Sequence, residues 1–184
     1  MALTLEQLRA ICPQTGIGKL AVFVEPLNAA FEEFGVGQGL EVAHFLAQAG
    51  HETGGFNWLI EFASGKAYEG RKDLGNDEPG EGERFKGRGI FQLTGDANYV
   101  KAGTEIWGDP DFLRYNPDAA AEPVNACRIA GWYWKRNALS AMAQRDDLVG
   151  ITKRVNGAAT EGPPSHLAER RKYLERAKLA LGIA

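Results

Sequence analysis

Hydrophobic residues return at helical spacing along most of the chain. The clearest segment is 40–52, LEVAHFLAQAGHE, where apolar side chains recur every three or four residues and predict one buried helix face. Gly54 and Gly55 follow this segment and provide the backbone freedom that ends a helix. Residues 19–35 show the same spacing up to a final glycine, and Pro26 within them predicts either a kink or the start of a second helix.

Further helices are predicted where a helix-starting residue precedes a periodic segment. Thr4 and Gln7 form a capping-box pattern for a helix that ends near residue 11. Pro123 occupies the favoured first position of another helix. The remaining predicted helices are 95–103, 147–156 with Asp146 as its cap, and 166–181 with Ser165 as its cap.

Residues 61–88 interrupt this helical pattern because they are polar, charged and rich in glycine. A loop of this length inside a compact domain is often functional, and we expect short strands or a hairpin within it. The chain has no internal repeat and no linker long enough to divide it. The sequence therefore predicts a mainly α (α+β) fold in a single domain, 1–184, with a small glycine-rich lobe at about 56–92.

Composition places the chain among folded globular proteins. Hydrophobic residues make up 44% and charged residues 24%, and no apolar run approaches the length of a membrane span. The N-terminus lacks a basic segment followed by a long apolar one, so no signal peptide is predicted. Cys12 and Cys127 are far apart, which favours two buried thiols over a metal site.

Charge is divided unevenly along the chain. Residues 1–127 carry 10 Lys or Arg and 19 Asp or Glu, whereas residues 128–184 carry 11 and 5. Such asymmetry indicates either a surface for an anionic partner or charges distributed over solvated helix faces. No basic-aromatic motif or zinc finger accompanies the basic part, so we expect no nucleic-acid partner.

The His51–Glu52 pair raises the question of a metal site. A zincin motif requires a second histidine at position 55, where this chain has Gly55. A Ser-His-Asp hydrolase is equally disfavoured, because the chain has no G-x-S-x-G motif. We therefore expect neither a metal nor another cofactor.

Glu52 has two interpretations: an exposed charge at a helix end, or a catalytic acid. The negative end of the helix dipole and apolar neighbours would both favour the protonated carboxyl that an acid catalyst needs. Glu61 lies nine residues further on, beyond two glycines, so the two carboxyl groups can face one another. Two opposed carboxyl groups are the requirement of glycoside hydrolysis.

The segment GRGIFQLTGDANYV, residues 87–100, supplies neutral polar groups beside glycines. Gln92, Thr94 and Asn98 offer donors and acceptors for sugar hydroxyls, N-acetyl groups or a water molecule. The alternative is a strand-to-helix junction in which Thr94 only caps the next helix.

Taken together, FLAQAGHETGGF, the glutamate at 61, YEGRKDLGN and FKGRGIFQLTGDANY resemble glycoside hydrolase family 19. This family contains chitinases and bacteriophage endolysins. The resemblance is strong over 40–100 and looser through 132–134 and 154–162. It implies a lysozyme-like, mostly helical fold with a substrate cleft, and inverting hydrolysis of a β-1,4 bond between N-acetylated sugars.

The resemblance also implies roles for individual residues. Glu52 matches the general acid, Glu61 the general base, and Thr94 the residue that helps the base to hold the attacking water. The positions that match substrate contacts or partners of the acid are Gln92, Asn98, Asn156 and His51. A packed, hydrogen-bonded core histidine is the alternative for His51.

Two departures from plant chitinases favour the compact, endolysin-like branch. The chain reads Gly-Arg-Gly-Ile-Phe where plant enzymes usually read Gly-Arg-Gly-Pro-Ile, and its second glutamate follows the first more closely. Glu69 is the next candidate for the base, although an ion pair with Arg71 or another loop arginine is its expected role.

These features support one leading hypothesis and two alternatives. The first is an endolysin that hydrolyses β-1,4 bonds of the peptidoglycan glycan strand for host cell lysis. The alternatives are a chitinase and a non-catalytic wall-binding module. We expect a monomer that is made in the host bacterial cytoplasm and reaches the wall through a separate pore such as a holin.

The C-terminal segment ERRKYLERAKLALG has both basic and apolar positions. It either packs an apolar stripe on the core or presents a basic face for weak contact with the anionic cell envelope. The basic positions are Arg170, Arg171, Lys172, Arg176 and Lys178. The apolar positions are Leu174, Ala177, Leu179 and Leu181.

Overall fold

The computed structural model describes residues 2–157 and 166–183, and its regular structure there is helical. The α-helices are α1 (Leu5–Ile11), α2 (Ile17–Phe34), α3 (Leu40–Glu52), α4 (Glu81–Arg84), α5 (Asp96–Trp107), α6 (Phe112–Tyr115), α7 (Pro123–Arg136), α8 (Leu139–Gln144), α9 (Leu148–Val155) and α10 (Leu167–Ala180). The 3-10 helices are η1 (Lys66–Tyr68), η2 (Lys72–Leu74) and η3 (Pro117–Ala121). The predicted mainly helical fold class is confirmed.

The strands expected within residues 61–88 are absent from the described structure. Two isolated antiparallel bridges, Ile60 with Arg88 and Arg88 with Leu93, are the β pairing in that region. Short helices η1, η2 and α4 take the place of a hairpin, because glycines with positive φ turn the chain every few residues.

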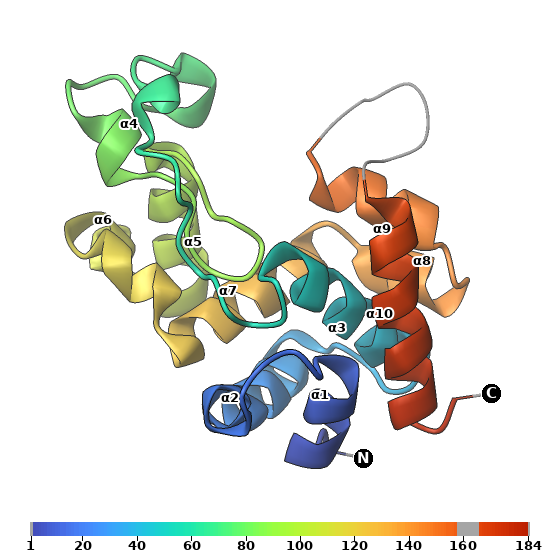
Figure 1. Cartoon of the computed structure of the whole chain (residues 1–184). Helices are drawn as coiled ribbons and strands as arrows, with labels where there is room; N and C mark the ends of the chain where they lie inside the picture. The colour runs from blue at the N-terminus through green and yellow to red at the C-terminus, as the bar shows by residue number, and fades with distance from the viewer. Residues whose placement is uncertain (1, 158–165, 184) are drawn as a thin grey trace.

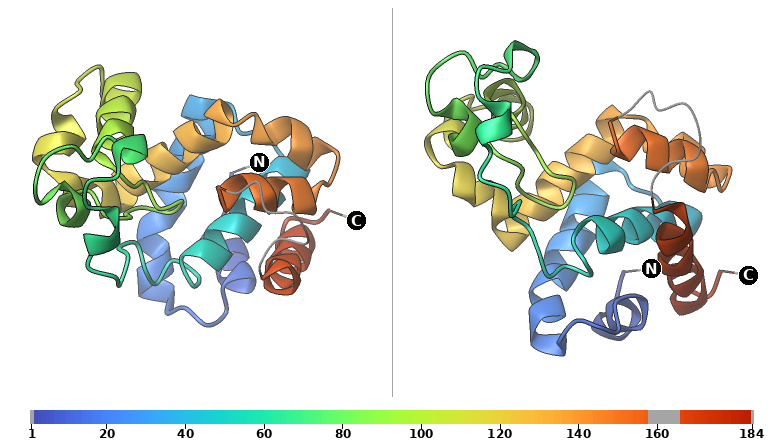
Figure 2. Two further views of the ribbon diagram at one scale, coloured as in Figure 1. Left: turned by 90° about the horizontal axis from the view of Figure 1, so that it is seen from above. Right: turned by 45° about the horizontal axis from the view of Figure 1, so that its top comes forward.

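The helices gather into two bodies that α7 connects (Figure 1). One body contains α1, α2 and α3 together with α8, α9 and α10. The other contains the glycine-rich segment, α4, α5 and α6, and stands apart from α9 and α10 in both views of Figure 2. A second hydrophobic core, whose buried residues include Phe85, Tyr99 and Trp132, supports this smaller body. The expected lobe of about 56–92 covers only part of that core.

Local signals explain where most helices begin and end. Thr4 and Gln7 form the predicted capping box of α1. Helix α2 runs without a break through Pro26 and ends at Gly35, which adopts the left-handed conformation. Pro123 opens α7 as predicted.

The cap of α9 differs from the prediction by one residue. Asp147 accepts the backbone N–H of Gly150 at 2.8 Å, whereas Asp146 binds the buried His44 and Lys178. The prediction of Asp146 as the cap was wrong because two adjacent aspartates carry the same local signal and tertiary partners decide between them. Ser165, the predicted cap of the last helix, lies outside the described residues.

Helix α3 lies at the centre of the larger body and packs against α10. Residues 41–50 are all buried, so the helix is covered on every side. A Cβ added to Gly50 would lie 2.7 Å from the Tyr173 ring, so only glycine permits this close approach of α10. The contact brings Arg170, one turn before Tyr173, against the C-terminal end of α3.

The structure corrects the expected faces of the C-terminal helix. Arg170 is buried and Lys178 pairs with Asp146, so neither is available to a basic outer face. Leu179 is 84% exposed and does not belong to the packed stripe, which includes Leu174 and Ala177. Packing on the core accounts for this helix, and envelope contact remains a proposal for its other basic residues.

Two further features concern the whole described chain. Cys12 and Cys127 are free, buried thiols, as expected, and burial raises the pKa of Cys12 to about 12. Among the described residues, no helix has both the length and the apolar character needed to span a bilayer.

Candidate active site

Glu61 lies in the segment that leads from α3 into the smaller body. Its backbone N–H donates to the Gly87 carbonyl at 2.9 Å, and the Gly87 N–H donates back to Glu61 Oε2 at 3.0 Å. The Tyr68 hydroxyl donates to Glu61 Oε1 at 2.9 Å. Burial raises the pKa of Tyr68, and hydrogen bonding to Glu61 raises it further, so this phenol keeps its proton as a donor. Two donors, one to each carboxyl oxygen, hold the Glu61 side chain in place.

Three side chains converge on the space above Gly87. A Cβ added there would lie 2.6 Å from Gln92 Oε1, 3.1 Å from Glu61 Oε2 and 3.3 Å from Thr94 Oγ1. The structure thus brings together the predicted base, the predicted water-holding threonine and one predicted sugar-contacting residue. A small polar space between a carboxylate and a hydroxyl has the chemistry needed to hold a nucleophilic water.

The neighbouring backbone fixes the orientation of these groups. Gln92 adopts a positive φ of 49°, and its side chain donates to the Gly89 carbonyl at 3.0 Å. The Thr94 hydroxyl donates to the Gln92 carbonyl at 2.9 Å, which leaves its oxygen lone pairs to accept from water. Asn98 Nδ2 donates to the Thr94 carbonyl at 2.8 Å, so Asn98 stabilises the backbone between Gln92 and Asn98.

Arg88 organises the loop that carries Gly87. Its side chain is 7% exposed and donates to the carbonyls of Arg84 and Lys86 and to the Tyr99 hydroxyl. Buried Tyr99 in turn donates to the Lys86 carbonyl at 2.8 Å. These bonds satisfy buried backbone groups and so make the position of the Gly87 N–H well defined.

Glu52 is the last residue of α3 and belongs to the other body. Arg170 Nη2 donates to Glu52 Oε1 at 2.5 Å, and the two side chains are 3% and 21% exposed, in that order. The sequence predicted apolar neighbours for Glu52, and this prediction was wrong. A buried guanidinium from α10 lies there instead, and it orients the Glu52 carboxyl group.

Arg170 is fixed by more than one partner. Its Nη1 donates to Gln48 Oε1, and Nη2 also donates to Asn156 Oδ1 at 2.8 Å. Gln48 donates to the Thr152 hydroxyl at 3.2 Å. The guanidinium therefore orients Glu52 Oε1, while no described residue donates to Oε2, the oxygen that we expect to carry the catalytic proton.

Sequence reasoning missed the roles of Arg170, Gln48 and Tyr68. Gln48 precedes Glu52 by four residues and therefore shares its helix face, a signal that the pattern did contain. Arg170 and Tyr68 reach the carboxylates through tertiary packing, and no local signal predicts them. Arg170 appeared only as one of several basic residues in the C-terminal segment.

His51 lies beside the acid but points to other partners. Its Nδ1 is 3.4 Å from Glu169 Oε2, and its ring centroid is 5.5 Å from that of His166. Burial lowers the pKa of His51, and the charge of Arg170 lowers it further, so both effects favour the neutral imidazole. Both predicted roles of His51 stay predictions.

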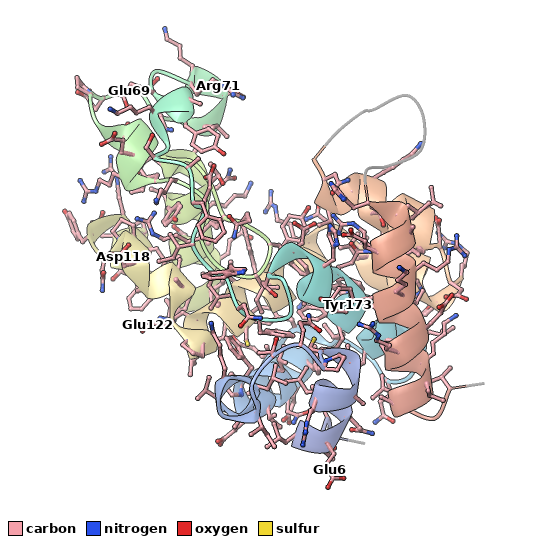
Figure 3. All side chains as sticks on the ribbon, viewed as in Figure 1. Glu6, Glu69, Arg71, Asp118, Glu122 and Tyr173 are labelled. Carbon is pink, nitrogen blue, oxygen red and sulfur yellow. The ribbon has the colours of Figure 1, made fainter. Side chains whose placement is uncertain are left out.

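Glu69 lies at the outer tip of the smaller body, together with Arg71 (Figure 3). It accepts the backbone N–H groups of Gly80 and Gly82 at 2.6 and 2.9 Å, and these bonds lower the pKa of its carboxyl. Arg71 pairs with Asp73. No described arginine pairs with Glu69, so the expected ion pair with Arg71 or another loop arginine was wrong, and Glu69 accepts two backbone N–H groups of its own loop instead.

We expect the substitution Gly87→Ala to reduce kcat by about 100-fold, because a methyl group would fill the space shared by Glu61, Gln92 and Thr94. Its φ is not positive, so the backbone accepts alanine, and the free energy of unfolding should fall by less than about 2 kcal/mol. Steady-state kinetics and urea denaturation measure both effects. Gly18→Ala, with nothing within 4 Å of its Cβ, is the control, and equal activity losses in both variants would contradict the assignment.

The fold and site together define a class of protein. Two glutamates extend from separate segments, one oriented by a buried arginine and the other grouped with the polar atoms of Gln92 and Thr94 beside Gly87. Glycoside hydrolases use such a pair of carboxyl groups.

Comparison with known proteins identifies the family. Residues 6–161 match the model of glycoside hydrolase family 19, described as chitinase class I. The chain belongs to this family and is, by that membership, a glycoside hydrolase that acts on a glycan. The family resemblance of the sequence is thereby confirmed.

Curated relatives come from bacteria and plants. A glycosyl hydrolase family 19 domain-containing protein of Haemophilus influenzae is 28% identical over 168 residues, covering 72% of this chain and 78% of the relative. An endochitinase of Arabidopsis thaliana is 33% identical over 156 residues, covering 82% of this chain. The match spans 51% of that plant protein's length.

Solved structures show the same fold. A bacterial family 19 chitinase superimposes with a TM-score of 0.78 at 24% identity, covering 100% of this chain and 97% of its own. A class IV chitinase from Zea mays gives a TM-score of 0.74 at 23% identity, covering 99% and 94%. The expected lysozyme-like architecture is confirmed by these likenesses.

Proposed function

We propose that this protein is an endolysin that hydrolyses β-1,4 glycosidic bonds of bacterial peptidoglycan. The observation that carries the hydrolytic part is the convergence of Glu61, Gln92 and Thr94 around Gly87, with Glu52 supplied by the other body. The short segment between the two glutamates and the Gly-Arg-Gly-Ile-Phe sequence support the compact, endolysin-like branch.

In the proposed mechanism, Glu52 protonates the glycosidic oxygen while Glu61 removes a proton from water. Arg170 holds one oxygen of Glu52, so the other oxygen faces the departing sugar. Thr94 Oγ1 and Glu61 Oε2 hold the water beside Gly87. Attack from the face opposite the leaving group inverts the anomeric carbon as the oxocarbenium-like transition state collapses.

The proposal includes a site of action. The enzyme acts as a monomer on the glycan strand and releases the host cell contents when the wall fails. It is made in the host cytoplasm and passes to the wall through a pore formed by another protein, such as a holin.

A chitinase is the second candidate, favoured by the relatives named as endochitinases and by the chitinase structures of the same fold. Chitin is a neutral polymer of N-acetylglucosamine, whereas peptidoglycan alternates this sugar with muramic acid. The two candidates share the chemistry of Glu52 and Glu61 and differ only in the strand that the enzyme accepts.

A direct assay separates them. Purified peptidoglycan and chitin oligomers are incubated with the enzyme, and new reducing ends are measured for each. The endolysin proposal predicts faster release from peptidoglycan. Release from chitin with none from peptidoglycan would refute it in favour of the chitinase.

A further inference from the structure

A basic pocket of about 560 Å³ lies between α7, α8 and α9. Its described lining includes Tyr133 and Asn137 from the end of α7, and Lys153 and Arg154 from the last turn of α9. No Asp or Glu belongs to that lining. We call this space, defined by Tyr133, Asn137, Lys153 and Arg154, the basic pocket.

The two cations of the basic pocket are not neutralised within the described part of the chain, where no carboxylate lies within ion-pair distance of either. This contrasts with Arg88, Arg114, Arg128, Arg136 and Arg170, each of which pairs with a carboxylate. Lys153 is half-buried and Arg154 is exposed, and unpaired cations that line a concave site attract anions. The pocket therefore has the charge expected for an anionic ligand.

The basic pocket adjoins the active site through Tyr133. The Tyr133 hydroxyl donates to the Arg154 carbonyl at 3.0 Å, and its ring lies 5.5 Å from that of Phe91, which precedes Gln92. Burial raises the pKa of Tyr133, the positive charge of Arg154 lowers it, and the negative charge of Glu52 raises it.

A second connection runs through the end of α9. Asn156, which accepts from the arginine that orients Glu52, lies between two residues of the pocket wall, Arg154 and Gly157. The pocket wall and the arginine that holds Glu52 are thus joined through Asn156. All four residues that define the basic pocket lie after residue 127, in the part of the sequence with an excess of Lys and Arg.

We propose that the basic pocket binds a carboxylate borne by the glycan strand, with Lys153 and Arg154 as its partners. This inference rests on the proposed function, because a carboxylate distinguishes strands that contain muramic acid from chitin, whose N-acetylglucosamine units carry none. The pocket then determines which strand the enzyme prefers, while Glu52 and Glu61 determine the reaction.

Two carboxylates of peptidoglycan could enter the pocket. In strands stripped of peptide, the lactyl ether of muramic acid ends in a free carboxylate. In intact strands this group is an amide, and the carboxylates belong to the stem peptide. The shared chemistry is a carboxylate attached through the muramic residue, and separate probes distinguish the two sources.

The test measures binding to the Glu52→Gln variant, which does not require turnover. The probes are peptide-stripped strands, uncrosslinked strands with stem peptides, and each of these with every carboxyl converted to a primary amide. We expect at least one carboxylate-bearing probe to bind about tenfold more tightly than its amidated form, as charge-assisted hydrogen bonds to two cations would produce. Adding Lys153→Gln and Arg154→Gln should abolish that difference.

A matched control removes the same two charges elsewhere. Arg9→Gln with Lys135→Gln, on α1 and α7, should retain the preference for the carboxylate, which excludes a general effect of net charge. Equal binding of carboxylate-bearing and amidated strands would overturn the inference. So would a preference that survives the double substitution in the basic pocket.

Failure of the proposed function is a separate result. It appears as an absence of new reducing ends when the parent enzyme meets peptidoglycan. The binding preference of the Glu52→Gln variant does not depend on that outcome, so a refuted pocket and a refuted endolysin are distinguishable.

Discussion

The variant Glu52→Gln should lose about 10²–10⁴-fold in kcat on a glycan strand while remaining folded. Glutamine keeps an oxygen that can accept from Arg170, so the contact between α3 and α10 survives without its ion pair. What it lacks is the proton that the departing sugar requires. Steady-state rates of reducing-end release measure the loss, with Glu175→Gln, an exposed glutamate on α10, as the matched control.

The leaving group provides a sharper form of this test. A 4-nitrophenolate departs with little help from an acid, so an aryl glycoside of an N-acetylglucosamine oligomer should restore much of the activity of the Glu52→Gln variant. If the variant is equally impaired on both substrates, Glu52 is not the acid. Unchanged rates on the natural strand would dismiss any catalytic role for it.

The second large effect is expected from Glu61→Gln, again about 10²–10⁴-fold in kcat. The amide oxygen can accept from Gly87 N–H while the amide nitrogen donates to the Tyr68 oxygen, so the loop should keep its shape. The variant cannot remove a proton from water. Because the base acts on the nucleophile, the loss should be the same on the glycan strand and on the aryl glycoside.

Glu69→Gln is the informative control for Glu61. Glu69 lies in the same glycine-rich loop and was the alternative base in the sequence. Its carboxylate accepts two backbone N–H groups, and a glutamine can accept only one of them, so the loop should lose stability. The folded variant should nevertheless retain most of the parent's kcat. A loss as large as that of Glu61→Gln would show that the base has been misassigned.

The sequence was sufficient to predict the elements that local physics controls. The bounds of α3 follow from its apolar spacing and the two glycines after it, and the start of α7 follows from Pro123. The glutamates and the Gln92–Thr94 segment were chosen because the motifs around them resemble glycoside hydrolase family 19, and glycosidase chemistry requires opposed carboxyl groups. Their roles remain predictions until the variants are measured.

The environment of each glutamate could not be predicted in the same way. Arg170 reaches Glu52 from 118 residues away because Gly50 allows Tyr173, and with it α10, to approach α3 closely. Helical periodicity identifies a buried face but does not name the residue that covers it. An apolar environment was therefore expected where the fold provides a guanidinium.

The structure of the glycine-rich segment, residues 61–88, could also not be predicted from local sequence. Its glycines predict turns. The side chains that stabilise each turn are polar and come from residues that are distant in sequence. Asn76, which is fully buried, donates to the Tyr68 carbonyl and accepts from the Asp96 N–H. Such side-chain bridges replace the strand pairing that was expected, and they position Tyr68 against Glu61.

The most direct test of the central claim is the configuration of the first product. Proton NMR of a peptidoglycan strand during the first minutes of cleavage reports the anomer of each new reducing end before mutarotation mixes the forms. Inversion by water held at Glu61 and Thr94 predicts the α-anomer. A β-anomer, or a product without a reducing end, would contradict the two-carboxylate inverting site described for Glu52 and Glu61.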